Sequence, residues 1–185
     1  MTTASQYDWH RDRQLKAKYN KSLSTVKSRI ITLMRENDNI VRLLYFLTPD
    51  SLSEKNVITP RIRRDIFVQN KPTTLVFLSN FNEEAVKEAR AEVHISFNEI
   101  RCFDAGLTKV PIISISVICS DKINDLNDEV GQRSDLLYQE ISDTISGFAV
   151  GTVGYLEEVS AKEGILKNNT HVIWSGKFQV GEIRL

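Results

Sequence analysis

One apolar segment and the helix predicted after it constrain the fold of this chain more than any other stretch. In Val110–Ser120 the β-branched residues Ile113, Ile115 and Val117 stand at alternate positions, and serines separate them. Alternation with period two predicts a strand that has one face on a hydrophobic core. The segment Asp121–Asp135 that follows is rich in Asp and Asn, which favour turns over a continued strand.

From Ser134 onward the apolar residues recur at helical spacing, as Leu137, Ile141, Ile145 and Phe148. This spacing predicts an amphipathic helix over 134–146, because residues three and four apart share one face of a helix. Gly147 can adopt the left-handed conformation that ends helices. A core strand, a polar loop and a helix that packs on the sheet are therefore expected in this order.

Length and charge narrow the class of protein. The chain has 185 residues, 41% of them hydrophobic and 26% charged, which suits a single globular domain with a sizeable core. Lys plus Arg and Asp plus Glu number 24 each. Equal numbers of basic and acidic residues argue against a protein whose main function is binding nucleic acid. We see no secretory signal and no apolar run of membrane-spanning length, so a soluble protein without a membrane partner is expected.

The remaining elements complete an α+β prediction. Helices are expected over Ser22–Asn37 and Ile40–Leu47, followed by a loop over Thr48–Pro60. The expected strands are 74–81, 92–102, 110–119, 150–158 and 170–182, with 92–119 as a long hairpin and 160–169 as a loop. The predicted fold is a mixed, mainly antiparallel sheet with an amphipathic helix on one face and an N-terminal helical segment.

The first twenty residues form a separate piece by composition. Residues 1–20 are polar and charged and carry no apolar stripe, which predicts a polar arm that is ordered only against a partner. A solvated arm with no partner is the alternative. Residues 21–185 are then a single α+β domain.

Cysteines and histidines give no sign of a metal or redox site. Cys102 and Cys119 lie far apart in apolar, strand-like context, so buried free thiols are expected. His94 alternates outward on a predicted strand, and His171 follows an Asn-Asn loop. Neither histidine has a cysteine or carboxylate at metal-ligand spacing. No metal and no cofactor are predicted.

Motifs of common enzymes are also missing. The GTVG segment at 151–154 lacks the lysine and serine of a phosphate-binding loop, and no nucleophile elbow exists. The acidic loop lacks the order of oxygen ligands that an EF-hand requires. We therefore expect no enzyme. A small hydrolase whose site is assembled from distant residues is the catalytic alternative.

Two blocks of opposite charge are the candidate interface residues. Three arginines lie within RIRR, at Arg61, Arg63 and Arg64. They either contact a partner or sit on the exposed face of a short strand containing Ile62 and Ile66. The opposite block is the acidic loop, with Asp121, Asp125, Asp128 and Glu129. The two blocks are predicted to meet across a subunit boundary and to set register more than affinity.

The order of elements resembles the neck and tail-completion proteins of long-tailed bacteriophages, the tail-terminator-like group. The matching features are a strand ending near Cys119-Ser120, a polar loop with Gly131, Arg133-Ser134-Asp135 entering a helix, and that helix closing on Ser146-Gly147-Phe148. In that group a G-x-R motif starts the main helix, and a Y-x-G-like segment lies in the last strand. Here Trp174-Ser175-Gly176 stands in that place.

This resemblance implies a virion structural protein, made in the host cytoplasm, that forms a homo-oligomeric ring, typically a hexamer. The ring would join the tail tube to the head-side connector and contact other neck and tail-tube proteins. DNA would pass through its lumen without sequence-specific binding, and the absence of net charge suits that role. The alternatives are another connector, adaptor or tail subunit, or a non-viral adaptor domain that binds a peptide along a sheet edge.

Overall fold

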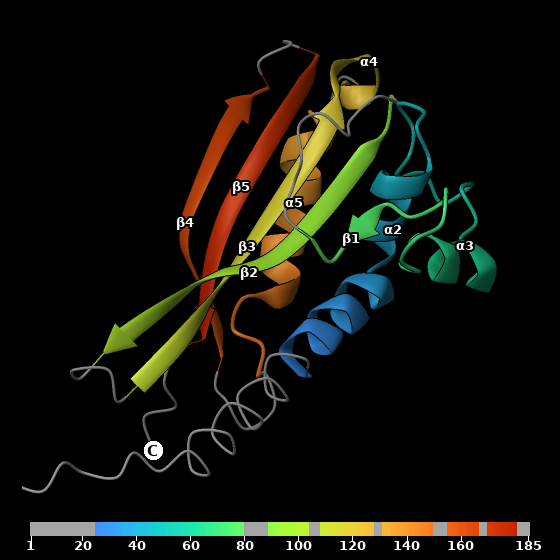
Figure 1. The fold of residues 1–185 in the computed structure, drawn as a ribbon. Coiled ribbons are helices and arrows are strands. Elements are labelled where there is room, and N and C mark those ends of the chain that lie inside the picture. The colour runs from blue at the N-terminus through green and yellow to red at the C-terminus, as the bar shows by residue number, and fades with distance from the viewer. Residues whose placement is uncertain are drawn as a thin grey trace, which may run out of the picture.

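A mixed five-stranded sheet forms the centre of the molecule (Figure 1). The computed structural model describes residues 25–79, 89–103, 108–127, 131–149, 155–166 and 170–180. The strands are β1 (Val76–Phe77), β2 (Ala91–Phe103), β3 (Thr108–Ser120), β4 (Leu156–Ile165) and β5 (His171–Val180). Their order in the sheet is β1-β2-β3-β5-β4. Only the β1–β2 pair is parallel, so the predicted α+β class with a mainly antiparallel sheet is confirmed.

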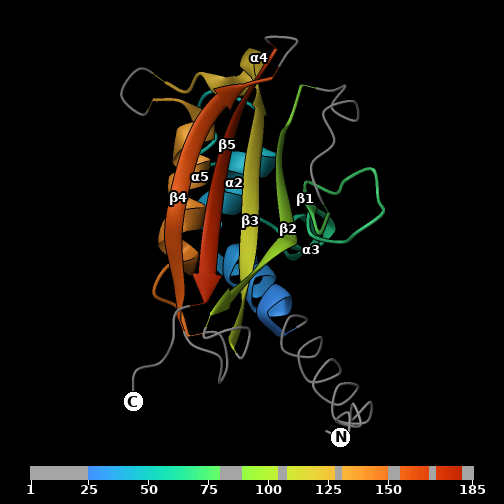
Figure 2. The same ribbon diagram turned by 60° about the vertical axis from the view of Figure 1, so that its left-hand side comes forward.

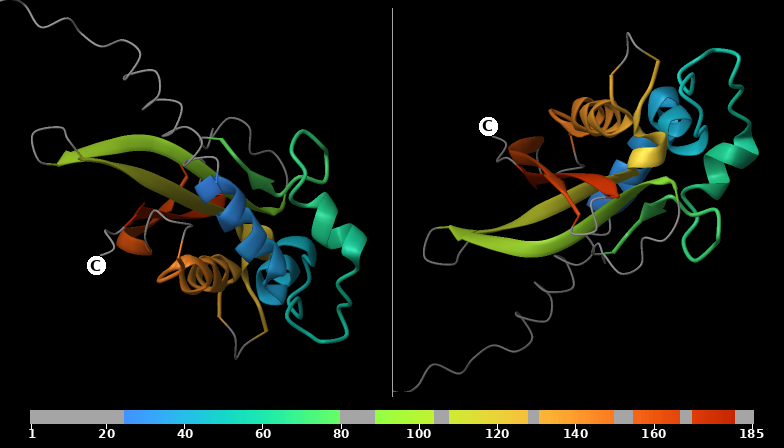
Figure 3. Two further views of the ribbon diagram at one scale, coloured as in Figure 1. Left: turned by 90° about the horizontal axis from the view of Figure 1, so that it is seen from below. Right: turned by 90° about the horizontal axis from the view of Figure 1, so that it is seen from above.

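Helices pack on one face of this sheet (Figure 3). A helix covers residues 25–36, and α2 (Asp38–Tyr45), α3 (Pro60–Asp65), α4 (Asp121–Asn124) and α5 (Arg133–Ile145) follow. The expected helix over 134–146 is confirmed as α5, and its Leu137, Ile141 and Ile145 are fully buried. The helix over 25–36 and α2 confirm the N-terminal helical segment.

Asn37 explains why the two N-terminal helices are separate. Its side chain accepts hydrogen bonds from the backbone N–H groups of Asn39 and Ile40, which is the role of an N-cap residue at the start of α2. The same side chain donates to Glu140 and Thr144 on α5, at 3.1 and 2.8 Å. One residue therefore starts α2 and fixes it against α5.

The strand Val110–Ser120 that was expected to organise the core does so. Ile113, Ile115 and Val117 of β3 are fully buried and face the helices, whereas Ser114 and Ser116 on the opposite face are partly exposed. A small second cluster, formed by Ile118, Leu166 and Ile173, lies on the serine side.

The predicted hairpin over 92–119 is confirmed as β2 and β3. Ala91 pairs with Cys119 at one end and Phe103 with Thr108 at the other. The register shifts between Ser96 and Glu99, where β2 has one residue more than β3, which is a β-bulge. Pro111 pairs with Ile100 beside this bulge, and it lies before Ile112, where the pairing of β3 with β5 begins, so its missing N–H interrupts no hydrogen bond to β5.

Two segments differ from their predicted conformation. Residues 160–169 were expected to be a loop, but β4 continues through Ile165 because its backbone pairs with β5 from Leu156 to Ile165, interrupted only by a register shift between Glu158 and Ser160. The segment Arg61–Arg64 was considered as part of a strand, but it forms α3. Thr59 caps this helix through a hydrogen bond from the Ile62 N–H, and Pro60 occupies its first turn, where a proline is favourable.

Several predictions lie outside the described residues. These are the arm at 1–20, the start of the expected strand 150–158, and the acidic residues Asp128 and Glu129. Cys102 belongs to β2, and only its backbone is described. Among the described residues, no helix is long and apolar enough to cross a membrane.

Candidate functional site

The arginines of α3 make their hydrogen bonds and ion pairs within the subunit. Arg61 and Arg64 both contact Asp65, at 3.4 and 3.3 Å, and their side chains remain 84% and 67% exposed. Arg63 pairs with Asp38 and donates to the carbonyl of Arg35, which leaves its side chain 29% exposed. Two of the three arginines are therefore available to a partner, and the third holds α3 against the N-terminal helices.

Asp65 lies at the centre of a group of positive charges. Burial alone would raise its pKa, but hydrogen bonds and charge from Arg64, a hydrogen bond from Arg61 and the charge of Lys71 together lower it. Three cations around one carboxylate give this surface an excess of positive charge. Basic side chains that gather on an exposed helix are able to bind acidic groups of a partner.

The acidic block is split between a helix and a loop. Asp121 lies in the first turn of α4, and Asp125 follows that helix and pairs through its backbone with Gln132. Both side chains are exposed. Asp128 and Glu129 lie outside the described residues. Figure 1 shows α4 at one end of the sheet and α3 beside β1, so the described acidic residues, Asp121 and Asp125, do not meet the α3 arginines within one chain.

A buried cation that the sequence patterns did not predict joins these elements. Arg133, the first residue of α5, is fully buried. Its guanidinium donates four hydrogen bonds, all to backbone carbonyls: Ile123 at 2.8 Å, Leu43 at 2.7 Å, Phe46 at 2.8 Å and Thr48 at 2.9 Å.

The position of those carbonyls explains why a charge is tolerated there. Leu43 belongs to the last turn of α2 and Phe46 is its C-cap. Carbonyls at a helix C-terminus carry partial negative charge and lack partners within the helix, so a buried cation satisfies them. Burial lowers the pKa of Arg133, as expected for a cation removed from water. Arg133 therefore closes α2, α4 and α5 into one unit and does not face an external ligand.

The residues before Arg133 place it. Gly131 has a φ of +93°, a conformation that side chains rarely adopt, so the glycine of the G-x-R motif is required by the backbone. The side chain of Asn124, at the end of α4, accepts a hydrogen bond from the Ser134 N–H at 2.9 Å and so caps α5 from a distance. The G-x-R motif was the signal for this cluster, although its resemblance-based interpretation did not include burial.

A second cluster fixes α5 to the sheet. The Tyr138 ring stacks on Trp174 of β5, with centroids 5.2 Å apart, and its hydroxyl donates to Glu158 of β4 at 2.7 Å. Trp174 donates to Asp135 at 2.8 Å. Burial, together with the nearby Glu158 carboxylate, raises the pKa of Tyr138. This phenol stays protonated and acts as a structural donor.

Gly176 makes that cluster possible. A Cβ at this position would lie 2.0 Å from the Tyr138 hydroxyl oxygen and 2.9 Å from the ring carbon that carries it. A glycine inside a strand often marks a bulge, but Gly176 pairs regularly with Ile115 and Ala161 in the middle of the sheet. The glycine is needed for close approach of a tyrosine and not for a change of strand direction.

His94 differs from its expected place on the outside of a strand. It is 9% exposed, its Nε2 lies 3.0 Å from Glu92, and its ring stacks on Phe77 at 4.8 Å. The reason is β1, which pairs beside β2 and brings Phe77 over His94. Glu92 is also buried and contacts Arg90. A carboxylate held between a histidine and an arginine satisfies a buried charge, which is a structural arrangement.

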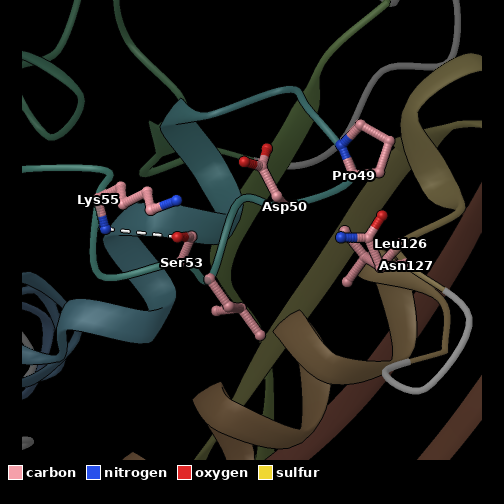
Figure 4. A pocket seen from close by; sticks show the side chains of 7 residues that line it. Pro49, Asp50, Ser53, Lys55, Leu126 and Asn127 are labelled. Atoms are coloured by element: carbon pink, nitrogen blue, oxygen red, sulfur yellow. Dashed lines mark hydrogen bonds between the residues drawn. The ribbon is translucent and has the colours of Figure 1, made fainter.

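A surface hollow lies between the segment 49–55 and the residues that follow α4 (Figure 4). Its volume is about 390 Å³. Apolar contact comes from Pro49, Leu52 and Leu126, and polar groups come from Asp50, Ser53, Lys55 and Asn127. Figure 4 shows Ser53 bonded to the backbone of Lys55 and not directed at a common point with the other polar groups.

Two of the predictions concern free thiols and metal sites. Cys119 is fully buried and free, as predicted, and burial raises the pKa of its thiol to about 12. In the part of the chain that the structure describes, no group of three or more His, Cys, Asp and Glu side chains is arranged to hold a metal ion.

Comparison with known proteins identifies a family. No curated protein matches this chain. The model of the YomW family matches residues 37–180, a range that runs from the cap of α2 to the end of β5. Since this match covers well over half of the chain, the protein belongs to YomW, a phage-associated family.

Proposed function

We propose that this protein is a structural subunit of the phage neck, a tail-terminator-like ring component that joins the tail tube to the head-side connector. The observation that carries the proposal is the match to a phage-associated family over residues 37–180. That range contains most of the elements on which the resemblance to tail-completion proteins rests, from α2 to the closing strand β5, whereas the helix over residues 25–36 lies before it.

The motifs of that resemblance support the proposal through their place in the fold. The G-x-R motif ends in Arg133, which ties α5 to the end of α2, and Gly176 in the last strand receives Tyr138 of α5. Both motifs therefore hold the main helix to the rest of the domain. A ring subunit needs a well-packed domain of this kind, because the lumen keeps a defined shape only if each subunit keeps its own shape.

In the proposed ring, identical subunits contact one another through two different surfaces, and DNA passes through the lumen without being read. A heterologous contact between two different surfaces generates a closed ring when its rotation closes. The expected state is a homo-oligomer, typically a hexamer, that binds neck and tail-tube proteins in the virion. The host cytoplasm is the site of synthesis.

Mass photometry of the purified protein tests the oligomeric state, and a phage defective in this gene tests the role. We expect a hexamer, and we expect the defective phage to accumulate separate heads and tails that the purified protein rejoins. A protein that stays monomeric, in a phage whose heads and tails join without it, would contradict the proposal.

A second candidate is an adaptor that binds a peptide along the edge of the sheet. The observation in its favour is β4, which forms one edge of the sheet and pairs with β5 alone among the described strands. An exposed edge can accept an additional strand from a partner. A monomer or dimer that binds another phage protein through β4 would favour this function.

A further inference from the structure

The exposure of β4 is unusual for its length. Residues 157–163 are all exposed, although they lie within a strand of ten residues. The strand is rich in Glu, Lys, Ala, Ser and Gly, which are not favoured in strands, so its own side chains contribute little to its stability. Two apolar side chains of this strand are nevertheless exposed to solvent, Val159 at 40% and Ile165 at 67%.

Charge also distinguishes this edge. Glu157 and Glu163 are exposed, and Lys162 offsets only one of them. We name the strand edge that carries Glu157, Val159, Glu163 and Ile165 the β4 flank. It presents side chains from both faces of the sheet, because the register with β5 shifts between Glu158 and Ser160. An open strand edge that combines acidic and apolar side chains is suited to a basic, partly apolar partner.

The opposite side of the molecule has the complementary composition. Arg61 and Arg64 of α3 and Lys71 surround Asp65, and Val57, just before this helix, is 70% exposed. We name the surface formed by Val57, Arg61, Arg64 and Lys71 the α3 flank. The backbone N–H groups of Leu75 and Val76 bond to the carbonyl of Ile66, so this flank is attached to the β1 edge of the sheet.

The two flanks face away from each other. The strand order places β1 and β4 at opposite edges of the sheet. Figures 1 and 2 show α3 beyond β1 at one side and β4 at the other side of the molecule. A basic surface and an acidic surface on opposite sides cannot meet within one subunit. They are placed as the two halves of a contact that repeats from one subunit to the next.

We propose that the β4 flank of one subunit docks against the α3 flank of a second copy of this chain. The inference rests on the proposed ring and identifies its contact surfaces. Arg61 and Arg64 lie opposite Glu157 and Glu163, while Val57 and Ile165 lose solvent exposure in the contact. This arrangement gives the α3 arginines an acidic partner on β4 instead of the expected partner around Asp121 and Asp125.

Charge reversal with compensation tests this contact. In low salt, the R61E/R64E and E157K/E163K variants should each require about tenfold more protein for half-assembly in mass photometry, which corresponds to roughly 1.4 kcal/mol per contact. The combined fourfold variant should recover assembly. The neutral variant R61Q/R64Q, which places no acidic side chain next to Asp65, should show a smaller loss.

Matched controls separate this contact from general effects of charge. The variant R29E/K122E changes the net charge by the same amount at two exposed positions away from both flanks, and it should assemble like the wild type. Circular dichroism should give the same helix content for every variant. Adding D121K/D125K to R61E/R64E should not recover assembly.

The outcomes are distinct. Recovery by E157K/E163K supports the proposal. Recovery by D121K/D125K alone, or an R61E/R64E variant that assembles normally, overturns it while leaving the ring intact. A wild-type protein that remains monomeric at every concentration overturns both this contact and the proposed ring. If an added acidic peptide or DNA binds the α3 flank of a monomeric protein, the second copy is the wrong partner.

Discussion

Arg133 shows how a single buried residue can connect elements that are distant in sequence. A buried charge is costly unless hydrogen bonds satisfy it, and Arg133 is satisfied by four carbonyls and not by a carboxylate. Because guanidinium donors point in several directions within a plane, arginine can reach carbonyls from α2 and α4 at once. Lysine carries a single ammonium group, so it cannot donate hydrogen bonds to carbonyls at these separate positions.

Replacing Arg133 with methionine should destabilise the protein by about 3 kcal/mol, since a buried acceptor left without a donor costs roughly 1 kcal/mol or more. Urea unfolding followed by circular dichroism measures this loss. The control is Arg35→Met, an exposed arginine whose loss should change the free energy of unfolding by less than about 0.5 kcal/mol. Equal stability of the two variants would show that Arg133 is not a structural link.

Glu92 gives the protein a predictable dependence on pH. Burial would raise the pKa of Glu92, but the hydrogen bond with His94 and the charge of Arg90 bring it below its ordinary value of 4.5. A carboxylate whose pKa is lowered by folding contributes stability above its unfolded pKa and loses that contribution as pH falls through its folded pKa.

The stability difference between wild type and Glu92→Gln should therefore be largest near neutral pH and should shrink as the solution is acidified below the ordinary pKa of 4.5. Urea unfolding at a series of pH values measures it. Glu54→Gln, at an exposed position outside both flanks, serves as the control and should show little difference at any pH. A difference for Glu92→Gln that stays constant down to acid pH would contradict the assignment.

Sequence patterns could not predict these buried polar groups. Arginine at the start of a helix is ordinarily exposed, and nothing near Arg133 points to carbonyls some ninety residues earlier in the chain. His94 alternates correctly with Val93 and Ile95, but its face is covered by Phe77, which comes from a two-residue strand. In both cases the partner is supplied by tertiary structure.

At the scale of whole elements, hydrophobic periodicity predicted correctly the helices and strands that have one fully buried face. β3 and α5 were predicted closely because their apolar residues are buried at regular intervals. β4 was missed beyond Glu158 because an exposed edge strand has no apolar alternation, and α3 was considered a strand because a six-residue helix with no buried residue has no amphipathic pattern. The candidate interface lies on these two elements, so sequence patterns alone could not have paired them.

The packing of α5 on the sheet depends on the absence of a side chain at Gly176. Gly176→Ala should destabilise the protein by about 2 kcal/mol, because the added methyl group would overlap the Tyr138 hydroxyl and force α5 outward. Thermal and urea unfolding measure the loss. Combining Gly176→Ala with Tyr138→Phe removes the closest atom, so the double variant should lose less than the sum of the two single variants.

Gly164 is the matched control for this prediction. It lies in the neighbouring strand β4, and a Cβ there would approach only Ile173, at an ordinary distance of 3.5 Å. Gly164→Ala should therefore change stability little. If both alanine variants behave alike, the close approach of Tyr138 is not what requires glycine in β5.

At the scale of the whole molecule, one main hydrophobic core lies between two different edges of the sheet. The helices, Arg133 and Tyr138 bind one face of the sheet into a single core, while α3 and β4 lie at its opposite edges. A subunit that uses two opposite edges for contact keeps its core unchanged on assembly, as is usual for pre-organised interfaces. Assembly and folding should therefore be separable by mutation at these edges.

The charge of the whole chain leads to a prediction about DNA. Lys plus Arg equals Asp plus Glu, at 24 each, so the protein has no general attraction for phosphate. Arg61, Arg64 and Lys71 form a basic cluster on the surface, and Asp65 offsets part of its charge. Such a cluster can displace about two counterions from DNA. The logarithm of the binding constant should therefore fall with the logarithm of the salt concentration with a slope of roughly −2.

Fluorescence anisotropy with double-stranded DNA should therefore show no binding at physiological salt and only weak binding at low salt, which R61E/R64E should abolish. Each additional phosphate contact would steepen the salt slope by about 0.9, so the slope counts the contacts directly. A steep slope with tight binding at physiological salt would mean that the protein holds DNA. Such binding would contradict the proposed lumen, because DNA that must move through a ring cannot be retained at many phosphates at once.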